Sequence, residues 1–296
     1  ALVGHHSKQQ RIAQDKPQNL MNSKTPNTMR RRMLAASIIL PGVALAGPAV
    51  ESSISKLDFG SLYRKLRYRG DDGVLFWWLS GTKYAHFENE VTPLHELEAC
   101  AIIRISTTTT GFRVTSLEHT FYTALRTGRP LEELKNPFTG ELLKYKRTPP
   151  QPLTIDYRSD ATFDVPSTMG TSRVAFNRSA AVLRTHGDQI WLQDDSSALV
   201  TSAAGTFSRA NDWSTFRCNQ KDILDARNQV PASTVHMQSV GSWQSWMNMG
   251  QRSGGLTSRI VGAKVRAFSG VPAVWRSLLE EFHPEVARAP IAALGA

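Results

Sequence analysis

The pattern of hydrophobic and polar positions changes its period near residue 71. Between residues 51 and 70, apolar side chains follow a mixed helical spacing within a polar, basic stretch. Residues 71–73 (DDG) are typical of a turn, and residues 74–81 (VLFWWLSG) form a short apolar run rich in aromatic side chains. The chain is therefore predicted to pass from a polar lead-in into a buried strand.

Further along the chain, β-prone runs alternate with clusters of turn-forming residues. A second strand is predicted over residues 96–106 and a long hairpin partner over residues 112–125. Shorter strands are predicted over residues 153–157, 172–176, 182–186, 189–193, 198–207, 213–218 and 233–243. Many strands at this spacing predict a mainly β fold, either an antiparallel barrel-like domain or a sandwich.

The end of the chain departs from this pattern. Residues 274–282 (VWRSLLEEF) have helical spacing, Pro272 suits the first turn of a helix, and Pro284 cannot continue one. A C-terminal helix is therefore expected on an otherwise β domain.

A secretory leader is predicted over residues 29–46 (MRRRMLAASIILPGVALA). A basic start, an apolar run over residues 33–45 and small residues at the end follow the plan of a signal peptide, with cleavage before Gly47. Arg30 and Arg31, followed by one further residue and two apolar ones, match the twin-arginine pattern. This leader predicts a protein of the periplasm, or a secreted one, exported by the twin-arginine route.

The leader also sets the expected domain organisation. Its apolar run is interrupted by Pro41 and Gly42 and is shorter than the roughly 20 residues that span a bilayer, so no stable membrane span is expected after cleavage. Residues 1–28 are interpreted as an upstream or non-native extension. Residues 47–296 are expected to form a single mainly β domain.

The net charge of +10 suggests nucleic-acid binding until it is divided along the chain. Residues 1–46 hold seven of the 35 basic residues and one of the 25 acidic ones, which leaves 28 basic and 24 acidic residues in the mature part. These are scattered rather than gathered into runs. The charge pattern therefore argues against a nucleic-acid partner.

Candidate acid–base residues lie in the predicted strand 112–125. Alternation places Glu118 and Tyr122 on one face and His119 on the other. On the inward face of a barrel, Glu118 is a candidate general base, Tyr122 or Tyr84 a hydrogen-bond donor, and Arg252 a stabiliser of an anion. The alternative is that this face is solvated and its polar residues are structural.

A second candidate feature is a cluster of large apolar side chains near residue 246. Trp243, Trp246, Met247 and Met249 lie within seven residues, and with Trp78 they could form the wall of a pocket for a flat apolar ligand. The alternative is that they plug the end of a barrel as core residues.

Metal and disulfide chemistry are both left open by the sequence. The histidines occur in no HxH or HExxH pattern, yet strands could bring His86, His95 and His236 together around a metal. Cys100 and Cys218 could form a disulfide in an oxidising compartment or remain two buried thiols. The sequence contains no nucleophile elbow, Walker loop, dinucleotide fingerprint or haem motif, so no cofactor is indicated.

Three stretches together resemble a known family. They are WWLSGTKYA (Trp77–Ala85), LEHTFYTALRTGRPLEELKNPFTGE (Leu117–Glu141) and SWQSWMNMGQRSGGLTSRIVGAK (Ser242–Lys264). The chain is similar over about residues 58–290 to the bacterial family catalogued as domain of unknown function 1838, many members of which carry twin-arginine leaders. The resemblance implies no established reaction.

These features support one main hypothesis and two alternatives. The main hypothesis is an exported β protein that binds a small apolar or aromatic molecule in a barrel cavity and could act as a cofactor-independent lyase or isomerase. The alternatives are a non-catalytic cell-envelope protein that binds a partner and a metalloenzyme with histidine ligands.

Overall fold

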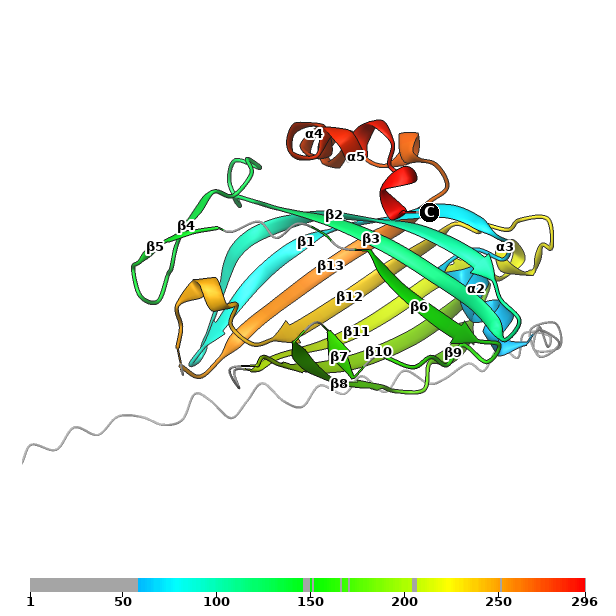
Figure 1. Ribbon diagram of the computed structural model, residues 1–296, viewed down its shortest axis with the longest axis horizontal. Coiled ribbons are helices and arrows are strands. Elements are labelled where there is room, and N and C mark those ends of the chain that lie inside the picture. The colour runs from blue at the N-terminus through cyan, green and yellow to red at the C-terminus, as the bar shows by residue number, and fades with distance from the viewer. Residues whose placement is uncertain are drawn as a thin grey trace, which may run out of the picture. The chain divides into compact units, whose positions relative to one another are not determined.

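The computed structural model describes residues 58–145, 150, 152–165, 167–169, 171–203, 207–250 and 252–295. The predicted leader and the extension before it lie outside the described residues. Within these residues, the strands form a curled antiparallel sheet and a separate two-stranded hairpin, β4 (Glu133–Lys135) with β5 (Leu142–Lys144). The predicted mainly β fold is confirmed, and the sheet is a half-barrel (Figure 1).

Neighbouring strands of the half-barrel are connected mainly by hairpins. The order across the sheet begins with β6 (Leu153–Arg158), β3 (Gly111–Thr123), β2 (Glu90–Thr107), β1 (Gly73–Phe87) and β13 (Gly255–Val265). It continues with β12 (Ser233–Gly241), β11 (Phe207–Asn219), β10 (Gln189–Thr201), β8 (Ser172–Arg178) and β7 (Thr168–Met169). β9 (Val182–His186) also pairs with β10.

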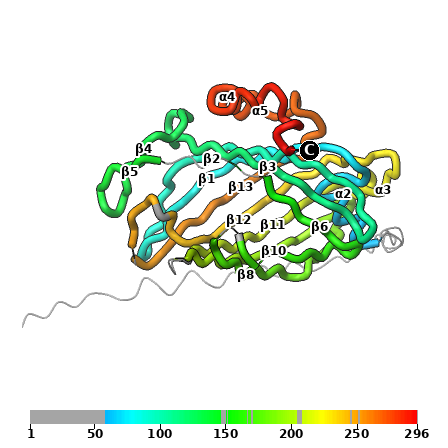
Figure 2. The backbone as a smooth tube through the Cα atoms, viewed as in Figure 1, coloured from blue at the N-terminus to red at the C-terminus, as the bar shows by residue number. Residues whose placement is uncertain are grey.

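The concave face of the half-barrel holds the main hydrophobic core. Helix α2 (Phe59–Arg67) lies at one end of this face, and its buried residues Leu62, Tyr63 and Leu66 pack against inward side chains of the strands (Figure 1). The loop between β12 and β13, which contains the 3-10 turn η1 (Ser245–Met247), lies at the other end of the sheet with β4 and β5 (Figure 2). The middle of the concave face lies between these two groups.

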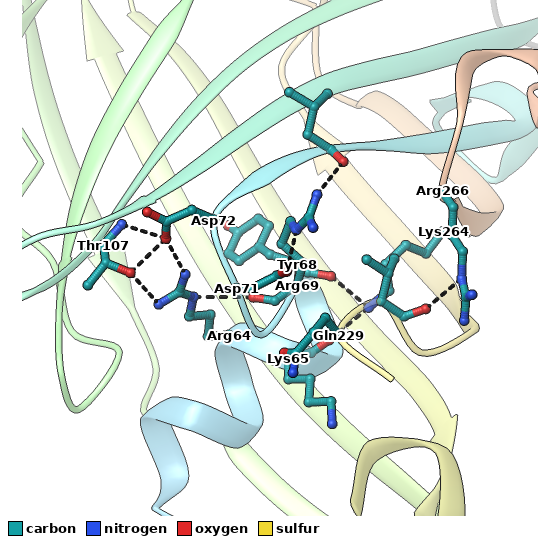
Figure 3. Close-up of polar contacts among 12 residues, drawn as sticks. Arg64, Lys65, Tyr68, Arg69, Asp71, Asp72, Thr107, Gln229, Lys264 and Arg266 are labelled. Atoms are coloured by element: carbon teal, nitrogen blue, oxygen red, sulfur yellow. Dashed lines mark hydrogen bonds and ion pairs between the residues drawn. The ribbon is translucent and has the colours of Figure 1, made fainter. Parts of the chain in front are cut away.

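Polar contacts fix the C-terminal end of α2 to the sheet. Lys264 donates from Nζ to the carbonyl oxygens of Lys65 and Tyr68, both at 2.8 Å (Figure 3). Arg64 contacts Asp72 at 3.0 Å and the Thr107 hydroxyl at 3.2 Å. Burial lowers the pKa of Lys264 to about 7. Through its two contacts, the side-chain nitrogen of Lys264 caps carbonyl groups that the helix end leaves without partners.

The convex face is covered at β1, β2 and β3 by the C-terminal helices α4 (Ala273–Phe282) and α5 (Pro284–Arg288) (Figure 1). Short 3-10 turns precede and follow them, η2 (Phe268–Gly270) and η3 (Ala292–Leu294). The fully buried Trp275 donates from its indole nitrogen to the carbonyl oxygen of His119 at 3.1 Å. The predicted C-terminal helix is thus confirmed, and Pro284 begins a second helix after ending the first.

The structure corrects two predictions about the strands. The predicted strands 189–193 and 198–207 are not separate, because β10 runs without a break over Gln189–Thr201 and β11 begins at Phe207. The polar residues 194–197 resemble a turn, but β11 pairs with all four of them and β8 pairs with Ser196 and Ser197. β13 was not predicted, because its glycines interrupt the strand pattern. A Cβ at Gly262 would lie 2.5 Å from the Trp78 carbonyl oxygen, so the close approach to β1 requires this glycine.

The short helix α3 (Gln220–Leu224) follows β11. Within the described part of the chain, no helix combines the length and the apolar character that crossing a bilayer requires.

Candidate functional site

A row of polar residues crosses the concave face at the limit of the hydrophobic core. Directly opposite residues in antiparallel strands point to the same face, so the strand register defines the row. It contains one residue from each of β10, β11, β12, β13, β1 and β2: Ser196, Asp212, Ser239, Ser258, Lys83 and His95. Closer to α2, the equivalent row contains Leu192, Phe216, Val235, Gly262, Leu79 and Ala99, which are apolar. The concave face therefore changes from core to polar surface along the strands.

Two charged groups in the polar row have no ion-pair partner among the residues that the structure describes. They are the carboxylate of Asp212 and the ammonium group of Lys83, and both side chains are half-buried. Three strand spacings, roughly 14 Å along the sheet, separate their backbones. The row thus offers a cation at one end, an anion towards the other and serine hydroxyls between them.

The β1 end of the row contains a compact group around Tyr122 of β3. Lys83 donates from Nζ to the Tyr122 hydroxyl oxygen at 3.3 Å, and the same nitrogen lies 5.1 Å from the centre of the ring. The imidazole of His95 packs against the ring with centroids 4.3 Å apart. Three strands therefore bring one cation, one phenol and one imidazole together. We call Lys83, His95 and Tyr122 the Tyr122 cluster.

His95 is the fully buried member of the Tyr122 cluster. Burial lowers the pKa of its imidazole to about 4, so the ring is neutral at physiological pH. Nδ1 lies 3.2 Å from the carbonyl oxygen of Glu96, and this contact favours the tautomer that keeps the hydrogen on Nδ1. Nε2 is buried and has no hydrogen-bond partner in the described part of the chain. The ring therefore offers an acceptor nitrogen beside Tyr122.

Aromatic side chains extend the Tyr122 cluster towards the loop between β12 and β13. The Tyr145 ring lies edge-on to Tyr122 at 5.1 Å and to Trp246 at 5.8 Å. The Trp246 indole nitrogen donates to the side-chain oxygen of Gln244 at 3.0 Å. Tyr122 and Trp246, both predicted site residues, are thus linked through Tyr145.

The other residues predicted for catalysis lie elsewhere. Glu118 is on the concave face with Tyr122, as alternation predicts, but it is exposed and its carboxylate accepts from the Thr120 hydroxyl at 2.8 Å. The half-barrel does not enclose this position, so the expected burial of Glu118 is absent. Arg252 is exposed in the loop before β13 and donates to the Met249 carbonyl oxygen at 3.3 Å. Tyr84 lies opposite Thr257. Because it follows Lys83 directly in β1, its side chain points to the other face of the sheet, away from Tyr122.

The predicted ligand-binding residues divide between two cores. Met247 and Met249 are almost fully buried in a cluster with Ala85, Leu94, Leu143 and Leu256, and Trp243 and Trp246 pack against its edge. This cluster plugs one end of the half-barrel, which matches the alternative interpretation of these residues. Trp78 packs on the convex face and donates to Glu98 at 2.8 Å. Trp78 and Trp246 therefore do not line a common pocket.

The structure also places the histidines and cysteines that the sequence left open. No group of three histidine, cysteine or acidic side chains within metal-binding distance occurs in the described ranges. His95 faces the concave side, whereas His236 is exposed opposite Val261 on the convex side. Cys100 and Cys218 are free, buried thiols in different cores on the two sides of the sheet.

Comparison with known proteins identifies the family. Residues 71–295 match the family described as "Protein of unknown function (DUF1838)". The chain belongs to the DUF1838 family. No curated protein and no solved structure matches this DUF1838 chain.

Two members of the Tyr122 cluster were not singled out as site residues from the sequence. Lys83 carries no motif, and the sequence indicates His95 only as a possible metal ligand. The signal for Lys83 was present in WWLSGTKYA, where alternation places it on the same face as Trp77. What the sequence lacked was the register that aligns β1, β2 and β3.

Proposed function

We propose that this DUF1838 protein binds a small apolar or aromatic molecule that carries an acceptor oxygen, at the Tyr122 end of the polar row. The observation that carries the proposal is the contact from Lys83 to the Tyr122 oxygen. Because the ammonium group fills one acceptor position of that oxygen, the phenol hydrogen remains available for a ligand. The rings of Tyr145 and Trp246, which meet edge-on, supply aromatic contacts beside it.

The reaction that suits this arrangement is proton transfer next to a carbonyl group, as in a cofactor-independent isomerase or lyase. A base removes the proton from the carbon beside the carbonyl, the electron pair moves to the carbonyl oxygen, and Tyr122 donates its hydrogen bond to that oxygen. Proton return at another carbon gives an isomer, and loss of a leaving group gives elimination.

Two groups are candidate bases for this step. His95 holds its Nε2 buried within the Tyr122 cluster, and Glu118 is exposed four residues along β3, roughly 13 Å away along the strand. His95 would therefore act on a carbon close to the carbonyl, whereas Glu118 would reach only the far end of an elongated ligand.

Binding of 2-acetylnaphthalene, a neutral aromatic ketone, tests the proposed site. Tyr122→Phe should weaken binding measured by calorimetry by roughly 2- to 13-fold, the value of one hydrogen bond of about 0.5–1.5 kcal/mol. The infrared stretching frequency of the ligand's carbonyl bond should be higher in complex with Tyr122→Phe than with the parent, because the variant has no hydroxyl to donate a hydrogen bond to the carbonyl oxygen. Tyr84→Phe, on the opposite face, is the matched control and should change neither quantity. Equal binding by both variants would refute the site.

Hydrogen exchange of the bound ketone shows whether the site catalyses proton transfer or only binds the ligand. In deuterium oxide, a proton-transfer site should accelerate exchange of the ketone methyl hydrogens, and His95→Gln or Glu118→Gln should reduce the rate according to which residue is the base. Binding without any acceleration would instead favour the non-catalytic alternative.

We also propose that the protein is exported by the twin-arginine route and works in the periplasm or outside the cell. The support is the leader pattern at residues 29–46. Replacing Arg30 and Arg31 together by lysine should retain the protein in the cytoplasm at its uncleaved mass, because the route requires the arginine pair. Cell fractionation with mass spectrometry checks this. Normal cleavage before Gly47 in the double variant would contradict the proposed route.

A further inference from the structure

A second candidate site lies at the seam of the half-barrel, where the segment after β6 returns to β7 and β8. A cavity of about 630 Å³ is present there, within the size range of small-molecule sites. Its walls include Phe59 of α2, Phe163 of the connecting segment, and Phe176 and Arg178 of β8. The rings of Phe163 and Phe176 lie 5.8 Å apart. The cavity thus combines an aromatic lining with one guanidinium group.

The guanidinium of Arg178 belongs to a network that carries excess positive charge. Asp194 is buried and accepts from Arg178 Nε at 2.6 Å, from the Tyr63 hydroxyl at 2.8 Å and from Arg67 Nη1. Burial raises the pKa of Tyr63 well above its usual value, so its hydroxyl adds no negative charge. Two arginines therefore share one carboxylate, and the network keeps a net charge of about +1.

Arg178 is the member of this network that reaches the cavity. Its Nη1 donates to the Ala161 carbonyl oxygen at 2.8 Å, while Nη2 is buried without a hydrogen-bond partner in the described part of the chain. Two acidic side chains also line the cavity. Asp164 is paired with Arg158, and Asp160 is exposed at the rim and accepts from Thr162. The buried charge at the cavity is thus cationic, whereas its two acidic side chains are exposed.

We propose that the seam cavity is a binding site for a small aromatic carboxylate, with the carboxylate beside Arg178 and the ring among the phenylalanines. A guanidinium group with unused donor capacity is suited to a carboxylate, and the excess charge favours an anion over a neutral ligand. The site is separate from the Tyr122 cluster. Five strand spacings, roughly 24 Å along the curved sheet, lie between Arg178 and Lys83.

Calorimetry with 2-naphthoate tests the seam site, with 2-naphthamide as the uncharged analogue. The wild-type protein should bind one 2-naphthoate at the seam at least about tenfold more tightly than 2-naphthamide, because a charge-assisted contact is lost in the amide. Arg178→Gln should remove this preference. Arg184→Gln, which alters an exposed arginine of β9, is the matched control and should preserve it. Equal binding of the two probes to the wild-type protein would overturn the proposal.

Two further variants keep the test decisive if Arg178→Gln does not fold. Asp160→Asn removes a negative charge near the cavity, so it should tighten 2-naphthoate binding by about 1.5- to 5-fold. If the cavity instead binds cations, this variant should weaken the binding of a cationic ligand. Lys83→Gln should leave the affinity unchanged, because Lys83 belongs to the Tyr122 cluster. Weaker binding in Lys83→Gln together with no response in Asp160→Asn would assign the probe to the Tyr122 cluster and refute the seam site.

Discussion

Replacing Asp194 with asparagine is expected to lower the free energy of unfolding by about 3–5 kcal/mol, the usual cost of removing one partner from a buried ion pair. The carboxylate is 5% exposed and receives hydrogen bonds from Arg67, Arg178 and Tyr63. Asparagine keeps one acceptor oxygen but removes the charge, so two arginines remain close together without a counter-ion. Urea denaturation at neutral pH measures the loss.

The exposed pair between Arg113 and Asp156 provides the control for this prediction. It has two contacts, at 2.7 and 2.9 Å, but the side chains are 51% and 57% exposed. Asp156→Asn should therefore cost less than about 1 kcal/mol, because water solvates both partners when the pair is broken. If the two variants lost similar stability, burial of Asp194 would not be the cause and the argument for a charged network would fail.

The position of Asp194 explains why this loss should affect the whole fold. Tyr63 and Arg67 belong to α2, Asp194 to β10 and Arg178 to β8. The same carboxylate therefore links the helix in the concave face to the strands at one edge of the sheet. The apolar core beneath α2 depends on this helix remaining in place, so the network couples the seam to the main core.

Features governed by local periodicity could be predicted from the sequence. The run 74–81 and the alternation of residues 112–122 give the strands and their faces, because side chains alternate whatever partner a strand has. The helix 274–282 follows from its apolar spacing and the prolines beside it. β13 could not be predicted, because Gly262 is required by the contact with β1 rather than by its own segment.

Features that depend on pairing between distant strands could not be predicted. Lys83, His95 and Tyr122 are brought together by the registers of β1 with β2 and of β2 with β3. The exposure of Glu118 depends on how far the sheet closes, which alternation does not determine. Long-range register, rather than residue type, thus decides which candidate residues form a site.

The folded protein is expected to lose stability as the pH falls from about 6.5 to 4, and His119 should account for roughly 3 kcal/mol of that loss. His119 is 3% exposed beneath the C-terminal helices, and its ring packs on His283 at 4.8 Å. Neither ring nitrogen has a hydrogen-bond partner in the described residues. Burial, with a smaller contribution from His283, lowers the pKa of His119 to about 4.

The sign of the effect follows from proton binding in the two states. The unfolded chain takes up a proton at His119 below about pH 6.5, whereas the folded protein does so only below about pH 4. Between these values the unfolded state binds more protons, so acid favours unfolding by roughly 1.4 kcal/mol for each unit of pKa difference. The buried imidazole of His95 should add a loss of the same sign.

Urea denaturation of His119→Phe at several pH values isolates the contribution of His119. Phenylalanine keeps a ring against His283 but cannot titrate, so the stability lost between pH 7 and pH 4 should be smaller than in the parent by about 3 kcal/mol. His186→Phe, at an exposed position of β9, should keep the pH dependence of the parent. Parallel losses in the parent and His119→Phe would show that the C-terminal helices do not hold a neutral imidazole against the sheet.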